Sequence, residues 1–163
     1  MDQKLTLQDG RKSLNEHVAF KGAELREKYG PEIGWTQLLR VLQDRGCVRY
    51  PCDVAFDAGP LQPGELAYPA PKGQRPEEGY IICVHPWFDS QRQRAPYAVL
   101  YQLVAVNYGE FASADDAETY GATALGISKD QYYETLCGMA DEIAGGCQGT
   151  PSTGLGTQKM LNK

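Results

Sequence analysis

Apolar residues recur at helical spacing in the first quarter of the chain. Residues 11–29 carry one apolar stripe along a predicted helix, and Gly22 within it allows a neighbouring element to approach closely. That stripe consists of Leu14, Val18, Leu25 and Tyr29. Pro31 ends this helix, and a second helix is predicted for residues 36–45. The apolar side chains that the second helix should bury are Leu38, Leu39 and Leu42.

After residue 46 the apolar positions alternate with a period of two, which predicts strands. Residues 47–57 alternate between an apolar and a polar face, although Pro51 inside the run indicates an edge strand or a bulge. A short strand at residues 65–68 lies between prolines. Residues 79–85 are nearly all apolar, which is typical of a central strand.

Residues 97–108 are rich in valine and tyrosine, and we interpret them as a fourth strand. The same segment also fits a helix, because aromatic and apolar side chains recur every three or four residues. The positions that give this second spacing are Tyr97, Tyr101, Val104 and Tyr108.

Two helices are predicted at the C-terminal end. Ser113 is the expected N-cap of the first, and Gly126 is its expected end. Ser128, answered three residues later by Gln131, forms a capping box that begins the second. The apolar stripe of this last helix consists of Tyr132, Leu136, Met139 and Ile143.

The predicted element order is α-α-β-β-β-β-α-α. Strands grouped between helices favour an α+β domain, with a mostly antiparallel sheet of about four strands and the helices packed on one face. We assign residues 1–144 to this single domain. Residues 145–163 are small, polar and aperiodic, so we predict a disordered, flexible tail there.

Composition is that of an ordinary soluble protein: 163 residues, 42% hydrophobic, with a net charge of −5. Such an acidic surface repels phosphate backbones, and basic residues do not cluster beside the tyrosines, so nucleic-acid binding is disfavoured. No apolar run is long enough for a membrane helix, and the first residues lack the apolar centre of a secretory signal. We therefore expect a cytoplasmic protein with reduced thiols, and the odd number of five cysteines agrees with this.

Four residues of the strand region form a candidate zinc site: Cys47, Cys52, Cys83 and His85. Three thiolates and one imidazole are an accepted zinc ligand set. However, Cys47 and Cys52 are five residues apart, which places them on opposite faces of a regular strand, and Cys52 lies on the apolar face as a core residue would. Another possibility is a metal-dependent hydrolase built on His85 and a carboxylate such as Glu65.

The same residues also raise the possibility of a thiol nucleophile. Cys83 and His85 are two positions apart on one strand, too far for direct activation of the thiol, whereas Cys52 and His85 could pair across the sheet. Asp115, Asp116 and Glu118 form an acidic cluster, which a helix N-terminus explains without chemistry.

No convergent catalytic set emerges, so the leading hypothesis is a non-catalytic module that binds a partner, either another protein or a second copy of itself. The expected contact surface is a rim of aromatic side chains beside the sheet edge. Its members are Tyr68, Tyr80, Trp87, Phe88 and Tyr97.

Overall fold

The computed structural model describes residues 7–148, which fold into an α+β arrangement of five α-helices and three strands. The helices are α1 (Leu7–Tyr29), α2 (Trp35–Leu42), α3 (Ala95–Tyr108), α4 (Ala114–Leu125) and α5 (Lys129–Gln148). The strands are β1 (Cys52–Phe56), β2 (Ala67–Pro71) and β3 (Tyr80–Val84).

The sheet is mixed, with the order β1-β3-β2. Strand β3 is central, as predicted, and it runs parallel to β1 and antiparallel to β2. The prediction of a mostly antiparallel sheet with four strands is therefore wrong. The parallel pair arises because β2 does not pair with β1. Strand β3 lies between them, antiparallel to β2 and therefore parallel to β1.

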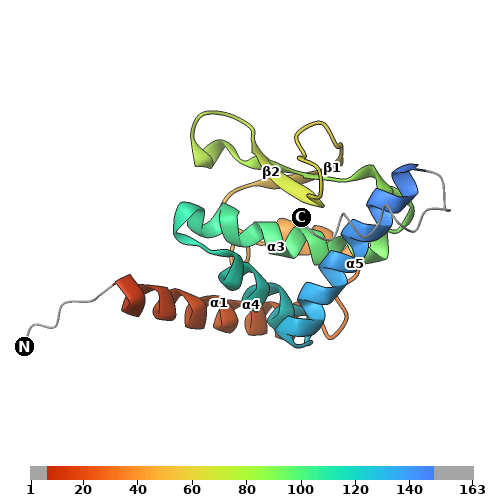
Figure 1. Ribbon diagram of the computed structural model, residues 1–163. Helices are drawn as coiled ribbons and strands as arrows, with labels where there is room; N and C mark the ends of the chain where they lie inside the picture. Colours follow the sequence, from red (N-terminus) through yellow and green to blue (C-terminus); the bar gives the residue numbers. More distant parts are fainter. Residues whose placement is uncertain (1–6, 149–163) are drawn as a thin grey trace, which may run out of the picture.

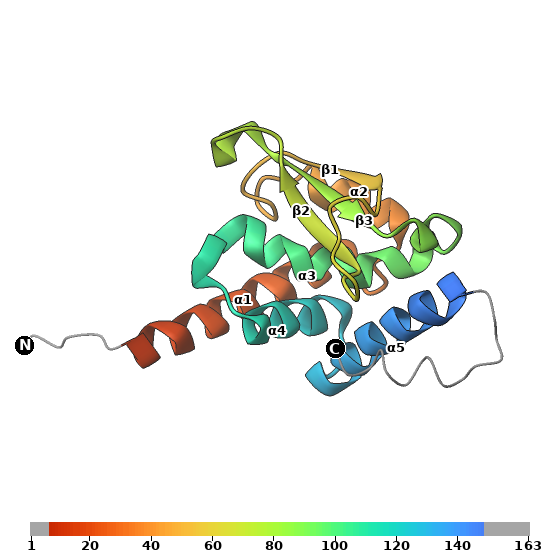
Figure 2. The ribbon, with the colours of Figure 1, turned by 45° about the horizontal axis from the view of Figure 1, so that its top comes forward.

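Figure 1 shows the molecule in layers, with the sheet at the top, α3 beneath it, and α1 and α4 at the bottom. Helix α3 contacts β2 and β3 on one side and α4 on the other. Side chains such as Ile82, Val84 and Leu103 are fully buried between these layers. Helix α2 contacts α1 and α3. In the view of Figure 2, α5 runs along the edge of the helical layers.

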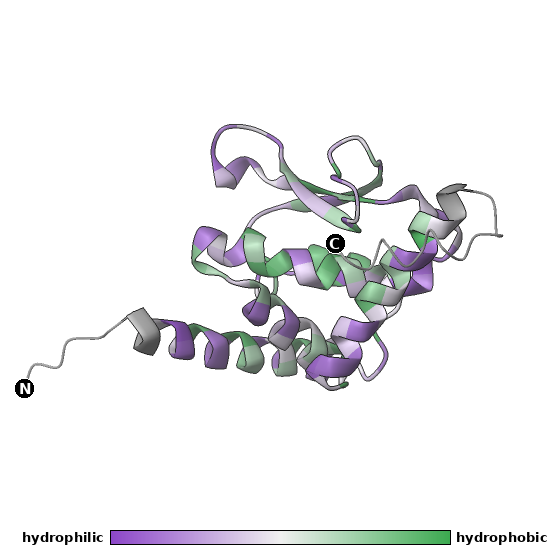
Figure 3. Ribbon diagram, in the orientation of Figure 1, coloured by the Kyte–Doolittle hydropathy of each residue, from purple (hydrophilic) through white to green (hydrophobic). Residues whose placement is uncertain are grey.

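Residues 97–108 form helix α3, so the prediction of a fourth strand is wrong and the helical spacing in that segment was the informative one. Valine and tyrosine favour strands mainly because they fit a half-buried pleated surface. Here the helix lies between two layers and buries side chains on most of its circumference. Its largely apolar character is visible in Figure 3. Pro96 fits because it lies in the first helical turn.

Strand β1 begins at Cys52 and not at residue 47, because side chains satisfy the preceding backbone. Asn107 donates its amide N–H to the carbonyl of Cys47 at 3.0 Å and accepts the N–H of Arg49 at 2.8 Å. The N–H of Cys47 bonds to the carbonyl of Asp44. These contacts hold residues 47–50 as a loop.

Strand β2 spans Ala67–Pro71 and includes two prolines, Pro69 and Pro71. A proline cannot donate a ladder hydrogen bond, so strands that contain it lie at sheet edges. The strand order confirms this position for β2.

Helix α1 packs along α4 through the close approach expected at Gly22. A Cβ atom at Gly22 would lie 2.8 Å from the carbonyl oxygen of Tyr120. The predicted stripe of α1 faces this contact, with Val18 and Leu25 fully buried.

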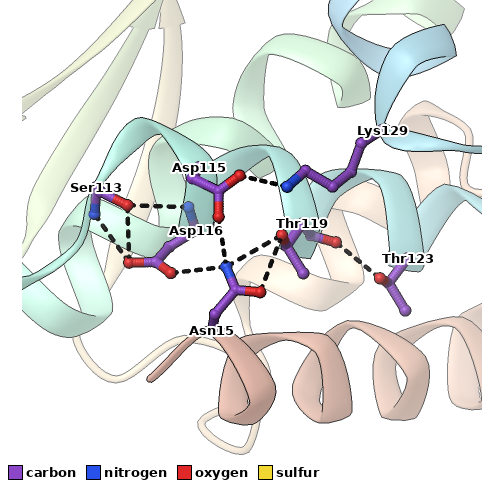
Figure 4. Close-up of polar contacts among 7 residues, drawn as sticks. All are labelled: Asn15, Ser113, Asp115, Asp116, Thr119, Thr123 and Lys129. Carbon is purple, nitrogen blue, oxygen red and sulfur yellow. Dashed lines mark hydrogen bonds and ion pairs between the residues drawn. The ribbon is translucent and has the colours of Figure 1, made fainter. Parts of the chain in front are cut away.

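A polar network also joins α1 to the start of α4 (Figure 4). The side-chain amide N–H group of Asn15 lies 3.0 Å from Asp115 Oδ2, 2.9 Å from Asp116 Oδ1 and 3.1 Å from Thr119 Oγ1. Asp116 also accepts the N–H of Ser113 at 3.0 Å, and Ser113 Oγ accepts the N–H of Asp116. The predicted Ser113 cap is confirmed, and Asp115 and Asp116 act in helix docking.

The remaining helices were predicted correctly as helices, but α1 begins at Leu7 instead of residue 11, and α2 ends at Leu42 instead of residue 45. Gly126 ends α4 with a left-handed φ of 73°, and the Ser128–Gln131 capping box begins α5. Leu39 was predicted to be buried but is 41% exposed. Val41 is buried in α2 instead. Helix α5 continues to Gln148, which makes the first four residues of the predicted tail helical, and residues 149–163 lie outside the described part of the chain.

Candidate ligand-binding groove

A groove of about 520 Å³ opens between the loop that precedes β2 and helix α5. Helices α3 and α4 form the rest of its wall. The lining residues are Pro63, Gly64, Glu65, Leu66, Ala67, Ala98, Tyr101, Gln102, Glu118, Tyr133, Leu136, Cys137, Ala140 and Asp141. Volumes of this size are typical of sites that receive a small ligand or a few side chains of a partner.

The position of α5 is set by Tyr132, which is fully buried. Its hydroxyl donates to the backbone carbonyl of Tyr97 at 2.6 Å, and the two rings stack with centroids 5.9 Å apart. Because residues four apart share a helix face, Tyr133, Cys137 and Asp141 then form a stripe beside the buried one. This second stripe faces the groove.

The groove owes its open space to alanines, which line it from three different elements. Ala67 comes from β2, Ala98 from α3 and Ala140 from α5. Larger apolar side chains, including Leu66 and Leu136, supply hydrophobic walls. An apolar side chain of a ligand would therefore lose contact with water on several sides.

Among the residues of the groove that the structure describes, three are carboxylates and none is a lysine or arginine. Burial raises the pKa of Glu118, which α4 directs into the groove. The ammonium of Lys129 lowers that pKa only in part, and it is itself paired with Asp115. Burial, followed by the charge of Glu118, also raises the pKa of Tyr101. The other two carboxylates, Glu65 and Asp141, add to the negative potential of the groove.

The structure does not bring the four predicted zinc ligands together. By the strand register, Cys52 and Cys83 lie on opposite faces of the sheet, since Cys83 pairs with Ala55 and Cys52 with Tyr80. Cys47 lies in the loop before β1, and Nδ1 of His85 accepts the N–H of Trp87. Across the described residues, no three His, Cys, Asp or Glu side chains are grouped as metal ligands would be.

The thiols are also held in their neutral form. Burial raises the pKa of Cys47 and of Cys52 to about 11, and it raises the pKa of Cys83 as well. Nucleophilic attack requires the thiolate, which burial disfavours. Burial also lowers the pKa of His85, which disfavours the charged imidazolium.

The predicted aromatic rim is divided among separate places. Phe88 is fully buried and has no surface to offer a partner, and Tyr97 is half-buried beneath Tyr132. Tyr80 is the first residue of β3, and Trp87 lies past the other end of that strand, in the short 3-10 helix Pro86–Ser90. Tyr68, with 40% of its surface exposed, is the most accessible of the five, and it does not line the groove.

Sequence reasoning missed most of the groove. Glu118 was noticed as part of an acidic helix start, and Glu65 as a possible metal ligand, but Tyr133, Cys137 and Asp141 were not singled out. Their spacing of four residues, directly beside the apolar stripe of the last helix, is the signal that could have found them.

Asp44, outside the groove, should make stability depend on pH. Its carboxylate accepts from Lys28 and Tyr29, both at 2.7 Å, and from the N–H of Gly46 at 2.8 Å. The hydrogen bond from Lys28, followed by that from Tyr29, holds the pKa of Asp44 well below its usual value of 3.8. A lowered pKa in the folded state stabilises the fold above pH 3.8, and this stabilisation is lost as the pH falls below that value.

We therefore expect Asp44→Ala to lower the free energy of unfolding by about 1–3 kcal/mol at pH 7 and by clearly less at pH 2.5. Urea unfolding of both proteins at the two pH values measures this. Asp53→Ala is the matched control, because Asp53 forms an exposed ion pair with Lys72, and such pairs contribute little. A cost for Asp44→Ala that does not change with pH would contradict the assignment.

No protein-family model, curated protein or solved structure matches this chain. None of the helices within residues 7–148 is long and apolar enough to cross a membrane. The cytoplasmic location expected from the sequence stays a prediction.

Proposed function

We propose that this chain is a non-catalytic partner-binding module whose groove receives a short protein segment. The segment would place a lysine or arginine beside apolar side chains. One observation carries the proposal: within residues 7–148, the groove combines apolar walls with the carboxylates of Glu65, Glu118 and Asp141, and no lysine or arginine lines it.

Each part of such a segment has a counterpart in the groove. Leu66, Leu136 and the small alanines suit an apolar side chain. Burial raises the pKa of Glu118, and a carboxylate partly removed from water gains from a cation that binds beside it. Tyr133 is 54% exposed at the rim, where tyrosine often anchors protein partners.

The hypothesis of a metal-binding protein, the competing reading of the sequence, gains no support from the positions of its four ligands. The partner-binding hypothesis keeps its function class but moves to a different surface. The groove replaces the aromatic rim as the proposed contact.

Selection from a random peptide library displayed on phage tests the proposal. The full chain is the bait. Peptides that also bind a Glu118→Gln, Tyr133→Ala double variant are discarded, because they bind outside the groove. We expect the enriched peptides to carry a lysine or arginine next to apolar residues. Fluorescence anisotropy with one enriched peptide should show Glu118→Gln weakening binding by about tenfold, the loss expected for one hydrogen bond to a charged group.

Glu134→Gln is the matched control, because Glu134 lies on α5, is exposed and does not line the groove. It should bind the peptide as the natural chain does. Enrichment of acidic peptides, or equal binding by the double variant, would refute the proposal.

A further inference from the structure

We propose that residues 159–163 of this same chain occupy the groove and compete there with segments of a partner. This inference rests on the proposed function, since it assigns to the same groove an occupant and a means of regulation. The occupant is identified by its charge, its apolar content and its reach.

The sequence Lys159-Met160-Leu161-Asn162-Lys163 has the composition that the groove favours. Two lysines enclose two apolar residues, and residues 149–163 contain no aspartate or glutamate. The groove presents the complementary set, with three carboxylates around apolar walls. Opposite charge on the two surfaces favours this pairing and disfavours acidic competitors.

The position of α5 makes the pairing reachable. This helix lines the groove through Asp141 and continues to Gln148, about 10 Å further along its axis at 1.5 Å per residue. The eleven residue steps from Gln148 to Lys159 can span up to about 35 Å when extended. The chain is thus long enough to return to the groove from the end of α5.

An occupant tethered in this way competes effectively with partners. A binding segment on a short tether acts at an effective concentration of about millimolar, so even a weak contact occupies the groove much of the time. A partner must then displace it, which raises the concentration of partner that is needed.

The other end of the described chain is poorly placed for this role. Helix α1 begins on the opposite side of the molecule from α5 in both Figure 1 and Figure 2. Residues 1–6 also include Asp2 beside a single lysine, Lys4. Charge and position therefore both favour the C-terminal segment.

Cys137 provides a direct test, because its thiol lines the groove and is partly exposed. In the full chain with Cys147→Ser, Leu161→Cys places a second thiol in the proposed occupant. Oxidised glutathione then drives disulfide formation, and mass spectrometry of tryptic peptides identifies the linked pair. We expect the link between positions 137 and 161 to form about tenfold faster than the link in a Thr153→Cys control chain.

Two results would overturn the inference. Equal rates for the two chains would show that position 161 has no preference for the groove. Disulfide-linked dimers at low micromolar protein would show that the segment comes from a second copy. A further expectation concerns charge, since Lys159→Glu with Lys163→Glu should slow the link several-fold and should strengthen binding of the selected peptide.

The experiment separates this inference from the proposed function. One outcome is that the selected peptide binds the natural chain and the Lys159→Glu, Lys163→Glu variant with equal affinity, and that no preferred disulfide link appears. The proposed function then stands, and the inference about residues 159–163 fails. If the link forms and no peptide is enriched, the groove serves the chain's own segment and the proposal of an external partner fails.

Discussion

Replacing Tyr132 by alanine is expected to lower the free energy of unfolding by about 3–5 kcal/mol, the usual cost of removing a buried aromatic ring. Tyr132 is fully buried, stacks on Tyr97 and donates its hydroxyl to the carbonyl of that residue. Its ring also fills the space above Gly121, where a Cβ would lie 2.3 Å from a ring carbon. The substitution therefore leaves a cavity where α3, α4 and α5 meet and removes the hydrogen bond from the hydroxyl.

Chemical unfolding in urea measures this effect, with Tyr133→Ala as a matched control. Tyr133 is the next residue, has the same side chain and is largely exposed, so its removal should change the free energy of unfolding by less than about 0.5 kcal/mol. Tyr132→Phe keeps the ring and loses one hydrogen bond, which should cost about 1–2 kcal/mol. Similar costs for Tyr132→Ala and Tyr133→Ala would mean that α5 is not anchored in this way.

Tyr132 and Tyr133 illustrate how much of the fold could be predicted from sequence. The stripe that contains Tyr132, the Ser128–Gln131 capping box and the Ser113 cap were all predicted, because each depends on residues within one or two helical turns. The helix that Tyr132 contacts was not predicted as a helix. Tyr97, on which Tyr132 stacks, lies in α3. The valines and tyrosines of α3 favoured a strand, and only the layers that cover this segment on both sides explain why it is a helix.

The groove was hidden from sequence analysis for a related reason. Its residues come from the loop before β2, the first residue of β2 and three helices, so no local spacing joins them. Cysteine and histidine are chemically versatile, so the sequence pointed instead to a site formed by Cys47, Cys52, Cys83 and His85. The structure does not bring these four residues together. The predicted strand parity concerned Cys47 and Cys52, but Cys47 lies before β1. It is the register between β1 and β3 that places Cys52 and Cys83 on opposite faces.

The contact between α1 and α4 gives the second large effect, in the substitution Gly22→Ala. In an open helix interior this change stabilises by about 0.5–1 kcal/mol, because alanine loses less conformational freedom on folding. At Gly22 the new Cβ would lie 2.8 Å from the backbone oxygen of Tyr120 and 3.1 Å from Cβ of Thr123. Since a backbone atom cannot rotate away, the two helices must separate, at a cost of about 1–3 kcal/mol.

Gly138→Ala is the matched control for this prediction, because Gly138 also lies inside a helix and a Cβ there would meet no atom within 4 Å. The same chemical change should therefore stabilise the protein at position 138 and destabilise it at position 22, which thermal unfolding of the two variants measures directly. The difference between them isolates the packing of α1 on α4, since helix propensity contributes equally to both. Stabilisation by both substitutions would show that α1 and α4 lie further apart than the contact at Tyr120 implies.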